Sequence, residues 1–133
     1  NNLIFKGRAR YEEIVHEYRD CDVFVNATSP GSVDKAVLEA MACGKPIVTS
    51  NTAYEEILGV FSKQMFIQNG DVANFSNQLA YFLEMDPEQR RNIGLQIRHI
   101  VIEKHSLNAF ADKVVTLMED LVKNNSKGND RKH

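Results

Sequence analysis

The hydrophobic positions change their period along the chain, from short continuous runs to spacings of three and four residues. The short runs predict strands at residues 3–5, 23–27 and 47–49, with a weaker one at 65–67. Apolar residues at helical spacing predict helices over 11–19, 34–43, 54–58, 72–84, 87–104 and 107–122. Strands that alternate with helices are typical of a parallel sheet covered by helices. The predicted fold class is therefore α/β, a Rossmann-like parallel sheet flanked by helices and ending in three helices.

The composition is that of one ordinary globular domain. The chain has 133 residues, of which 43% are hydrophobic and 26% are charged, close to average values for such domains. Its formal net charge of −2 argues against broad electrostatic attachment to nucleic acid or to an anionic membrane. No apolar run approaches the ~20 residues that a bilayer crossing needs, and no signal-peptide pattern is recognisable. We therefore expect no nucleic-acid partner, no transmembrane segment and a cytoplasmic location.

Cysteines and cationic residues suggest no further chemistry at this stage. Cys21 and Cys43 lie among apolar residues without metal-ligand spacing, so we interpret them as buried thiols in a reducing compartment and predict no metal site. Arg90, Arg91 and Arg98 share one predicted helix, but acidic residues interrupt them and no aromatic residues interleave. They are interpreted as a charged helix face. Polar residues 124–133 are predicted to form a mobile tail, which leaves 1–123 as the folded part.

The segment between the strand at 23–27 and the helix at 34–43 carries the most informative pattern. Residues 29–32, Ser-Pro-Gly-Ser, are small and turn-forming. A turn that leads into a helix leaves backbone N–H groups unpaired and aimed at one point, where the helix dipole adds partial positive charge. Such a point suits a phosphate group. The chain is therefore predicted to handle a phosphorylated ligand.

Two residues within that helix sharpen the prediction. Glu39 leans back over the turn that contains Lys35, because Cβ bonds tilt toward the helix N-terminus. Its carboxylate could accept hydrogen bonds from neutral hydroxyls such as a ribose diol, which leaves Lys35 for the phosphates. Alternatively, the two residues form only an i,i+4 surface pair, although Lys before Glu is the less favourable order. Asp34 would compete with phosphate for the dipole, and we favour an ordinary helix-start role for it.

Several stretches resemble one enzyme family. Residues 38–48, LEAMACGKPIV, resemble the LEAMACGKPVV signature of the group 1 glycosyltransferases, the retaining two-Rossmann-domain enzymes of glycosyltransferase family 4. Residues 20–29, DCDVFVNATS, resemble the ADVFVLPS strand of that family, and Gly70-Asp71 resembles its NGD…LA step. Ser50-Asn51 with Glu-Glu-Ile at 55–57 resembles its S…G…EII loop. The similarity covers about residues 3–105 and identifies the chain with part of the C-terminal, donor-binding domain of the GT-B fold.

The resemblance implies a retaining hexosyltransferase that moves a sugar from a nucleotide diphosphate donor, UDP- or GDP-linked, to a hydroxyl acceptor in polysaccharide or glycolipid synthesis. It implies no cofactor beyond the donor, and no catalytic side chain can be assigned. The donor-binding residues that it implies are Gly31, Ser32, Val33, Lys35, Glu39, Gly7 and Arg8.

The resemblance implies a different role for each group of these residues. The amides of residues 31–33 and the Lys35 ammonium would stabilise the developing charge on the diphosphate, and Glu39 would hold the ribose. Gly7 and Arg8 follow the first predicted strand, at the edge where open α/β sheets bind ligands, and would lie near the base. Arg8 can also be read as a solvated loop cation.

One position departs from the family pattern. The family carries two glutamates with seven residues between them, and the first falls at Gly31, which has no side chain. The sequence GSVDK at 31–35 resembles a minority variant of the family, so it does not indicate a catalytically inactive enzyme. It leaves open which donor sugar is bound.

The chain opens abruptly on a predicted strand of a buried sheet. We therefore expect a piece of a larger enzyme whose N-terminal acceptor domain is missing, inactive alone because transfer needs donor and acceptor positioned together. Any peripheral membrane contact is expected through that missing domain. Two alternatives stay open: a nucleotide-sugar epimerase on the same fold, and a non-catalytic nucleotide-sugar-binding or regulatory domain. The second alternative stays open because Gly31 stands where the family carries a glutamate.

Overall fold

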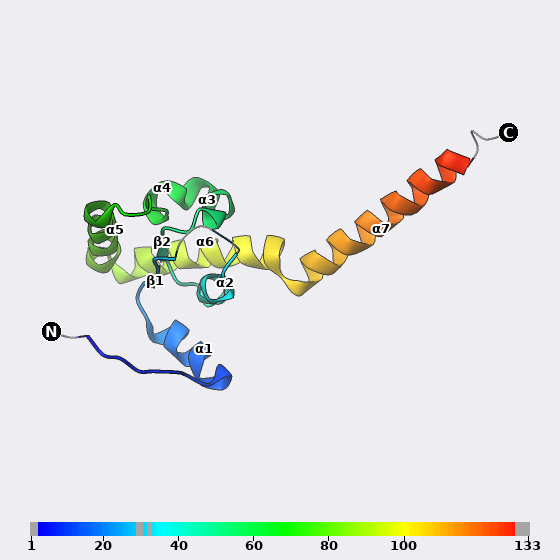
Figure 1. Cartoon of the computed structure of the whole chain (residues 1–133). Coiled ribbons are helices and arrows are strands. Elements are labelled where there is room, and N and C mark those ends of the chain that lie inside the picture. The colour runs from blue at the N-terminus through cyan, green and yellow to red at the C-terminus, as the bar shows by residue number, and fades with distance from the viewer. Residues whose placement is uncertain (1–2, 29–30, 32, 130–133) are drawn as a thin grey trace. The chain divides into compact units, whose positions relative to one another are not determined.

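The computed structural model describes residues 3–28, 31 and 33–129, and Figure 1 shows the course of the chain. The chain divides into two compact units, Asn1–Val101 and Ile102–His133. The first unit contains the strands and every described candidate site residue. The second contains the last turn of α6 (Pro87–His105) and the whole of α7 (Leu107–Asn129).

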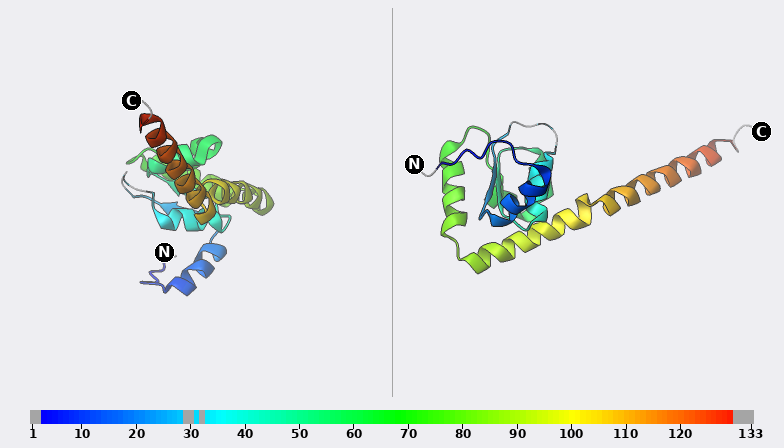
Figure 2. Two further views of the ribbon diagram at one scale, coloured as in Figure 1. Left: turned by 90° about the vertical axis from the view of Figure 1, so that its right-hand side faces the viewer. Right: turned by 90° about the horizontal axis from the view of Figure 1, so that it is seen from below.

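A small parallel sheet lies inside the first unit (Figure 2). Strands β1 (Phe24–Asn26) and β2 (Ile47–Thr49) pair in parallel, with Phe24 opposite Ile47 and Asn26 opposite Thr49. A single parallel bridge joins Thr49 to Phe66 on the other side of β2. Because parallel strands need a crossover connection, the chain returns from β1 to β2 through a helix, α2 (Lys35–Ala42). The predicted α/β class, a parallel sheet flanked by helices, is confirmed.

Helices surround this sheet. In the first unit they are α1 (Tyr11–Asp20), α2, α3 (Ala53–Leu58), the 3-10 turn η1 (Gly59–Phe61), α4 (Ser62–Met65), α5 (Val72–Glu84) and most of α6. Helix α2 contacts both strands, whereas α4 and α5 contact β2. The predicted helices at 11–19, 34–43, 54–58, 72–84 and 87–104 are confirmed to within a residue or so at each end. The turn η1 and the short α4 were not predicted.

The core of the first unit forms where α2, β2 and the later helices meet. Its fully buried side chains come from every layer: Val37, Met41, Ile47, Val48, Tyr54, Leu58, Met65, Ile67, Phe82 and Ile97. All three residues of β2 are buried, as expected for a strand covered on both faces. The core therefore packs α2 against the sheet.

Helix α2 ends in a Schellman motif that also receives α6. The Gly44 N–H donates to the Met41 carbonyl at 2.9 Å, and the Lys45 N–H donates to the Ala40 carbonyl at 3.1 Å. Gly44 has φ +73°, the left-handed region that favours glycine. Gly94 of α6 packs directly on this turn, and a Cβ on Gly94 would lie 1.9 Å from the Gly44 carbonyl oxygen. The short sequence Cys-Gly-Lys-Pro at 43–46 thus ends α2 and provides the surface on which Gly94 of α6 packs.

Three predictions about elements were wrong. Residues 3–5 form no strand: Leu3, Ile4 and Phe5 are 74%, 77% and 88% exposed. An apolar run becomes a parallel strand only when a neighbouring strand and two covering faces bury it, and no described residue supplies these. The strand predicted at 65–67 is reduced to the Phe66 bridge, because α4 includes Met65 and the Phe66 N–H donates to the Ser62 carbonyl at 2.8 Å. Helix α7 runs to Asn129, beyond its predicted end at residue 122.

The second unit exposes a stripe of apolar side chains along α7. Leu107, Phe110, Val114, Leu117 and Leu121 are each at least 41% exposed. Their spacing alternates between three and four residues, so they lie on one helix face. The predicted mobility of residues 124–133 stays a prediction, and residues 130–133 of that tail lie outside the described residues.

Candidate functional site

Hydrogen bonds between side chains tie the carboxyl ends of the two strands to the start of α2. The Asn26 amide nitrogen donates to Asp34 Oδ2 at 3.1 Å, and the Asn26 amide oxygen accepts from the Thr28 and Thr49 hydroxyls at 2.9 and 3.2 Å. The Ser50 hydroxyl donates to the Thr28 carbonyl at 3.3 Å. No buried side-chain polar atom in the described part of the chain lacks a hydrogen-bond partner. This satisfied network joins the ends of β1 and β2 to the N-cap residue of α2.

Asp34 is the N-cap of α2. Its Oδ1 accepts from the Ala36 N–H at 3.0 Å, and its backbone carbonyl accepts from the Tyr54 hydroxyl of α3. Burial raises the pKa of Tyr54, so this hydroxyl remains a neutral donor at physiological pH. The helix-start interpretation of Asp34 is confirmed. The cap uses the Ala36 N–H, and the amides that remain for an anion lie upstream of it.

The predicted phosphate residues face solvent on that turn. Gly31 is exposed, and a Cβ placed on it would meet nothing within 4 Å. Val33 is 41% exposed, and Lys35 is exposed without an ion pair to any described residue. Ser32 lies outside the described residues. The described members of the predicted cradle are therefore all exposed, between the end of β1 and the first turn of α2.

Glu39 is half-buried on α2 and is held by a residue of α1. Its Oε2 accepts from the Tyr18 hydroxyl at 3.0 Å, and Tyr18 is 7% exposed. Burial, and then this hydrogen bond, raise the pKa of Tyr18 to about 12. The other carboxylate oxygen has no hydrogen bond to a described residue, and no ion pair joins Glu39 to Lys35. The structure thus disfavours the surface-pair alternative and leaves Glu39 Oε1 able to accept from a ligand hydroxyl.

Tyr18 and Tyr54 are the positioning residues that the sequence did not reveal. Tyr18 was visible only as one apolar position of a predicted helix, and Tyr54 as the first residue of another. Each hydroxyl bonds to α2 across more than a dozen residues of chain, so only the tertiary fold brings them there. One hydroxyl bonds to the N-cap residue of α2 and the other to Glu39, five residues further along.

Gly7 and Arg8 lie elsewhere. They are exposed, in the segment before α1, and line a groove of about 610 Å³ whose lining residues all fall between Ile4 and Glu17. No α2 residue lines that groove, so the structure does not bring these two residues together with Glu39. Their role near the base stays a prediction.

A second pocket of about 300 Å³ opens at the carboxyl edge of the sheet. Its lining follows each strand end in turn: Ala27 after β1, Ser50 after β2, and residues 68–72 after the Phe66 bridge, with Phe75 from α5. Ligands of open α/β sheets bind in this crevice. Position could have indicated two of these residues, since Ser50 and Gln68 come directly after the apolar runs at 47–49 and 65–67.

The family model described as glycosyl transferase-like matches residues 2–116. The chain belongs to this glycosyl transferase-like family. The match spans the first unit from its second residue onward, including β1, α2, β2 and the pocket at the carboxyl edge, and it supports a role in sugar transfer. Searches of curated proteins and of solved structures found no match.

Two further properties of this glycosyl transferase-like chain concern metal ions and membranes. Within residues 3–28, 31 and 33–129, no three His, Cys, Asp or Glu side chains gather as metal ligands would. Over the same residues, no helix combines the length and hydrophobicity that a membrane crossing requires.

Proposed function

We propose that the chain is the donor-binding part of a retaining hexosyltransferase, which transfers a sugar from a nucleotide diphosphate sugar to a hydroxyl acceptor in polysaccharide or glycolipid synthesis. The observation that carries the proposal is Glu39, held by Tyr18 beside the turn that begins α2. A carboxylate with one oxygen anchored and the other accessible suits a vicinal diol such as that of ribose.

The diphosphate would lie against the turn before Asp34. The amides of Gly31 and Val33 and the Lys35 ammonium are the groups proposed to stabilise the charge that develops on the leaving diphosphate. The Asn26–Asp34 hydrogen bond and the Asp34 cap support this role, because they hold the start of α2 against the end of β1. UDP and GDP are the proposed nucleotides, and an acceptor domain is part of the proposal because transfer needs donor and acceptor held together.

Titration of the 133-residue chain with UDP-glucose and GDP-mannose, followed by calorimetry, tests the proposal. Glu39→Ala removes the ribose acceptor and should weaken donor binding at least tenfold, whereas Glu39→Gln, which keeps one acceptor oxygen, should weaken it less. Glu84→Ala changes an exposed carboxylate at the end of α5 and is the matched control. Equal donor affinity for Glu39→Ala and the native chain would refute the ribose assignment.

A non-catalytic nucleotide-sugar-binding domain is a second candidate, favoured by the absence of a side chain at Gly31. There is room for a side chain there, because a Cβ on Gly31 would meet nothing within 4 Å. Gly31→Glu should therefore fold normally. In a whole protein that also contains the acceptor domain, sugar release or transfer by the native sequence would exclude the non-catalytic candidate, and retained anomeric configuration in the product would exclude epimerisation.

A further inference from the structure

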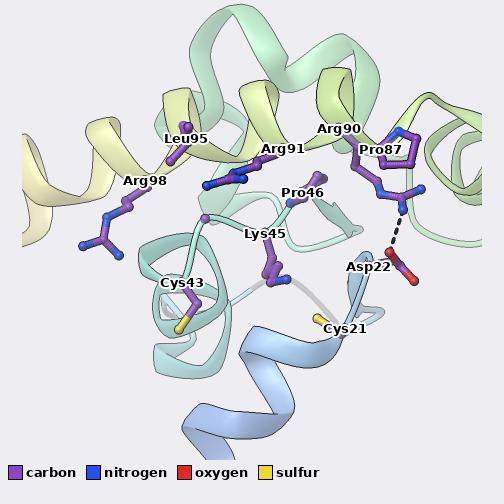
Figure 3. A pocket seen from close by; sticks show the side chains of 11 residues that line it. Cys21, Asp22, Cys43, Lys45, Pro46, Pro87, Arg90, Arg91, Leu95 and Arg98 are labelled. Carbon is purple, nitrogen blue, oxygen red and sulfur yellow. Dashed lines mark hydrogen bonds and ion pairs between the residues drawn. The ribbon is translucent and has the colours of Figure 1, made fainter.

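A pocket of about 420 Å³ lies at the amino ends of the two strands, on the opposite edge of the sheet from the candidate donor site (Figure 3). One side consists of the residues that lead into the strands: Cys21 and Asp22 before β1, and residues 43–46 before β2. The other side is α6, which contributes side chains between Pro87 and Arg98. The pocket belongs entirely to the first unit and shares no residue with the carboxyl-edge pocket.

The lining is strongly cationic. It contains four cationic side chains, Lys45, Arg90, Arg91 and Arg98, and one carboxylate, Asp22. The whole chain carries a formal charge of −2, so this local excess is not a general property of the surface. Clustered charge of one sign in a concave site raises the local concentration of the opposite ion.

Two of the arginines are fixed by the fold. Arg90 Nη2 pairs with Asp22 Oδ1 at 2.6 Å, and its Nη1 donates to the Phe82 carbonyl at 2.9 Å at the end of α5. Arg98 Nη1 donates to the Ala42 carbonyl at the end of α2. These contacts satisfy carbonyls in the last turns of two helices, which is a structural role. They also hold two positive charges at the pocket.

The other two cationic side chains do not bond to helix carbonyls. The side chains of Lys45 and Arg91 make no hydrogen bond or ion pair with any residue in the described part of the chain, and Figure 3 shows Arg91 on α6 and Lys45 on the segment that leads into β2. Burial raises the pKa of the Cys21 thiol, so Cys21 adds no negative charge at neutral pH. Pro46 and Leu95 add apolar surface beside the cations. The pocket therefore offers two available charged donors above a partly apolar wall.

We propose that this pocket binds a small organic phosphate, with Lys45 and Arg91 contacting the phosphate or diphosphate and the apolar wall contacting the remainder of the molecule. The volume lies within the range of small-molecule pockets, roughly 300–1,000 Å³. Lys and Arg bind phosphate oxygens through charge-assisted hydrogen bonds, and Arg can do so in a bidentate manner. This site is separate from the proposed donor site, so the glycosyl transferase-like domain has an anion site at each edge of its sheet.

Titration of the isotope-labelled chain with sodium pyrophosphate, followed by amide NMR spectra, tests this proposal. Sodium chloride at matched ionic strength serves as the reference. We expect saturable shifts of the Cys21, Gly44 and Arg91 amides. The double variant Lys45→Gln/Arg91→Gln should weaken this binding at least tenfold and each single variant less. Lys63→Gln, at an exposed position on α4, should leave it unchanged.

A second arm distinguishes a free phosphate ligand from a lipid headgroup. Phosphatidylcholine vesicles that contain phosphatidic acid present phosphate on a surface, whereas glucose 1-phosphate presents it on a free molecule. Glucose 1-phosphate should shift the same three amides, with the same loss in the double variant. The proposal is overturned if pyrophosphate and glucose 1-phosphate produce no saturable shift at these amides, if the double variant binds as the native chain does, or if only the vesicles bind.

Discussion

Gly94 should be intolerant of any side chain, because of its contact with the turn that ends α2. A Cβ at this position would lie 1.9 Å from the Gly44 carbonyl oxygen and 2.8 Å from the Gly44 carbonyl carbon. Real Cβ atoms do not approach backbone atoms so closely, so Gly94→Ala must displace either α6 or the turn. The turn resists, because its Gly44 and Lys45 N–H groups are bonded to carbonyls of α2.

The size of the effect follows from two opposing contributions. Overpacking of a closely packed site costs about 1–3 kcal/mol, and a backbone collision places this case at the upper end. Alanine in a helix interior is more favourable than glycine by about 1 kcal/mol. Gly94→Ala should therefore lower the free energy of unfolding by about 2 kcal/mol, which for a chain of this size lowers Tm by about 7 °C.

Urea and thermal unfolding, followed by circular dichroism at 222 nm, measure this loss. Asn92→Ala on the same helix is the matched control, because Asn92 is exposed and its replacement only improves helix propensity. We expect the control to be as stable as the native chain or slightly more so. If Gly94→Ala matches the native chain or exceeds it, the close approach of α6 to the Gly44 turn is not a feature of the protein.

The remaining predictions concern the tyrosine that holds Glu39. Tyr18→Phe removes the hydroxyl donor to Glu39 Oε2 and should lower the free energy of unfolding in urea by about 1.5–3 kcal/mol, a typical value for a hydrogen bond to a charged group; an unchanged midpoint would show that the hydrogen bond contributes nothing. The same variant should weaken UDP-glucose binding severalfold in the calorimetric titration, because Glu39 loses its anchor, and unaltered binding would remove Tyr18 from the donor site. Stability should also fall as the pH rises from about 10 to about 12, since the folded state holds the Tyr18 proton after the unfolded state, with its ordinary pKa near 10, has released it. This fall should be shallower in Tyr18→Phe, with Tyr54 supplying the remainder, and equal slopes in the two proteins would contradict the raised Tyr18 pKa.

Local patterns were sufficient to predict those parts of the fold that depend on neighbours in the sequence. The strand at Ile47–Thr49 and the helix at Val72–Glu84 match their predicted bounds, because a buried apolar run and a capped amphipathic helix are both encoded within a few residues. Asp34 as a helix-start residue follows from the same short-range chemistry. The strand at residues 3–5 fails for the complementary reason. Its apolar character is local, but a strand also needs a partner, and the described chain supplies none.

The start of α2, where the candidate site is proposed, was predictable from the sequence, whereas the hydrogen bonds that support it were not. The start of α2 follows from turn and helix signals, so the residues near it could be named in advance. The hydrogen bonds from Tyr18 to Glu39 and from Tyr54 to Asp34 join elements that are distant in sequence. The same holds for the basic pocket at the amino edge, where Lys45 and arginines from α6 line one cavity. Arg90, Arg91 and Arg98 could be recognised in the sequence only as a charged helix face.

Mapping the donor by amide NMR tests the central claim most directly. UDP-glucose or GDP-mannose is titrated into the native chain and into Glu39→Ala, and the shifted amides are assigned. We predict saturable shifts at Gly31, Val33 and Lys35, together with Ser50 at the neighbouring strand end, and their loss in Glu39→Ala. Shifts confined to other parts of the chain, with the turn before α2 unaffected, would contradict the claim that this turn and Glu39 hold the nucleotide sugar.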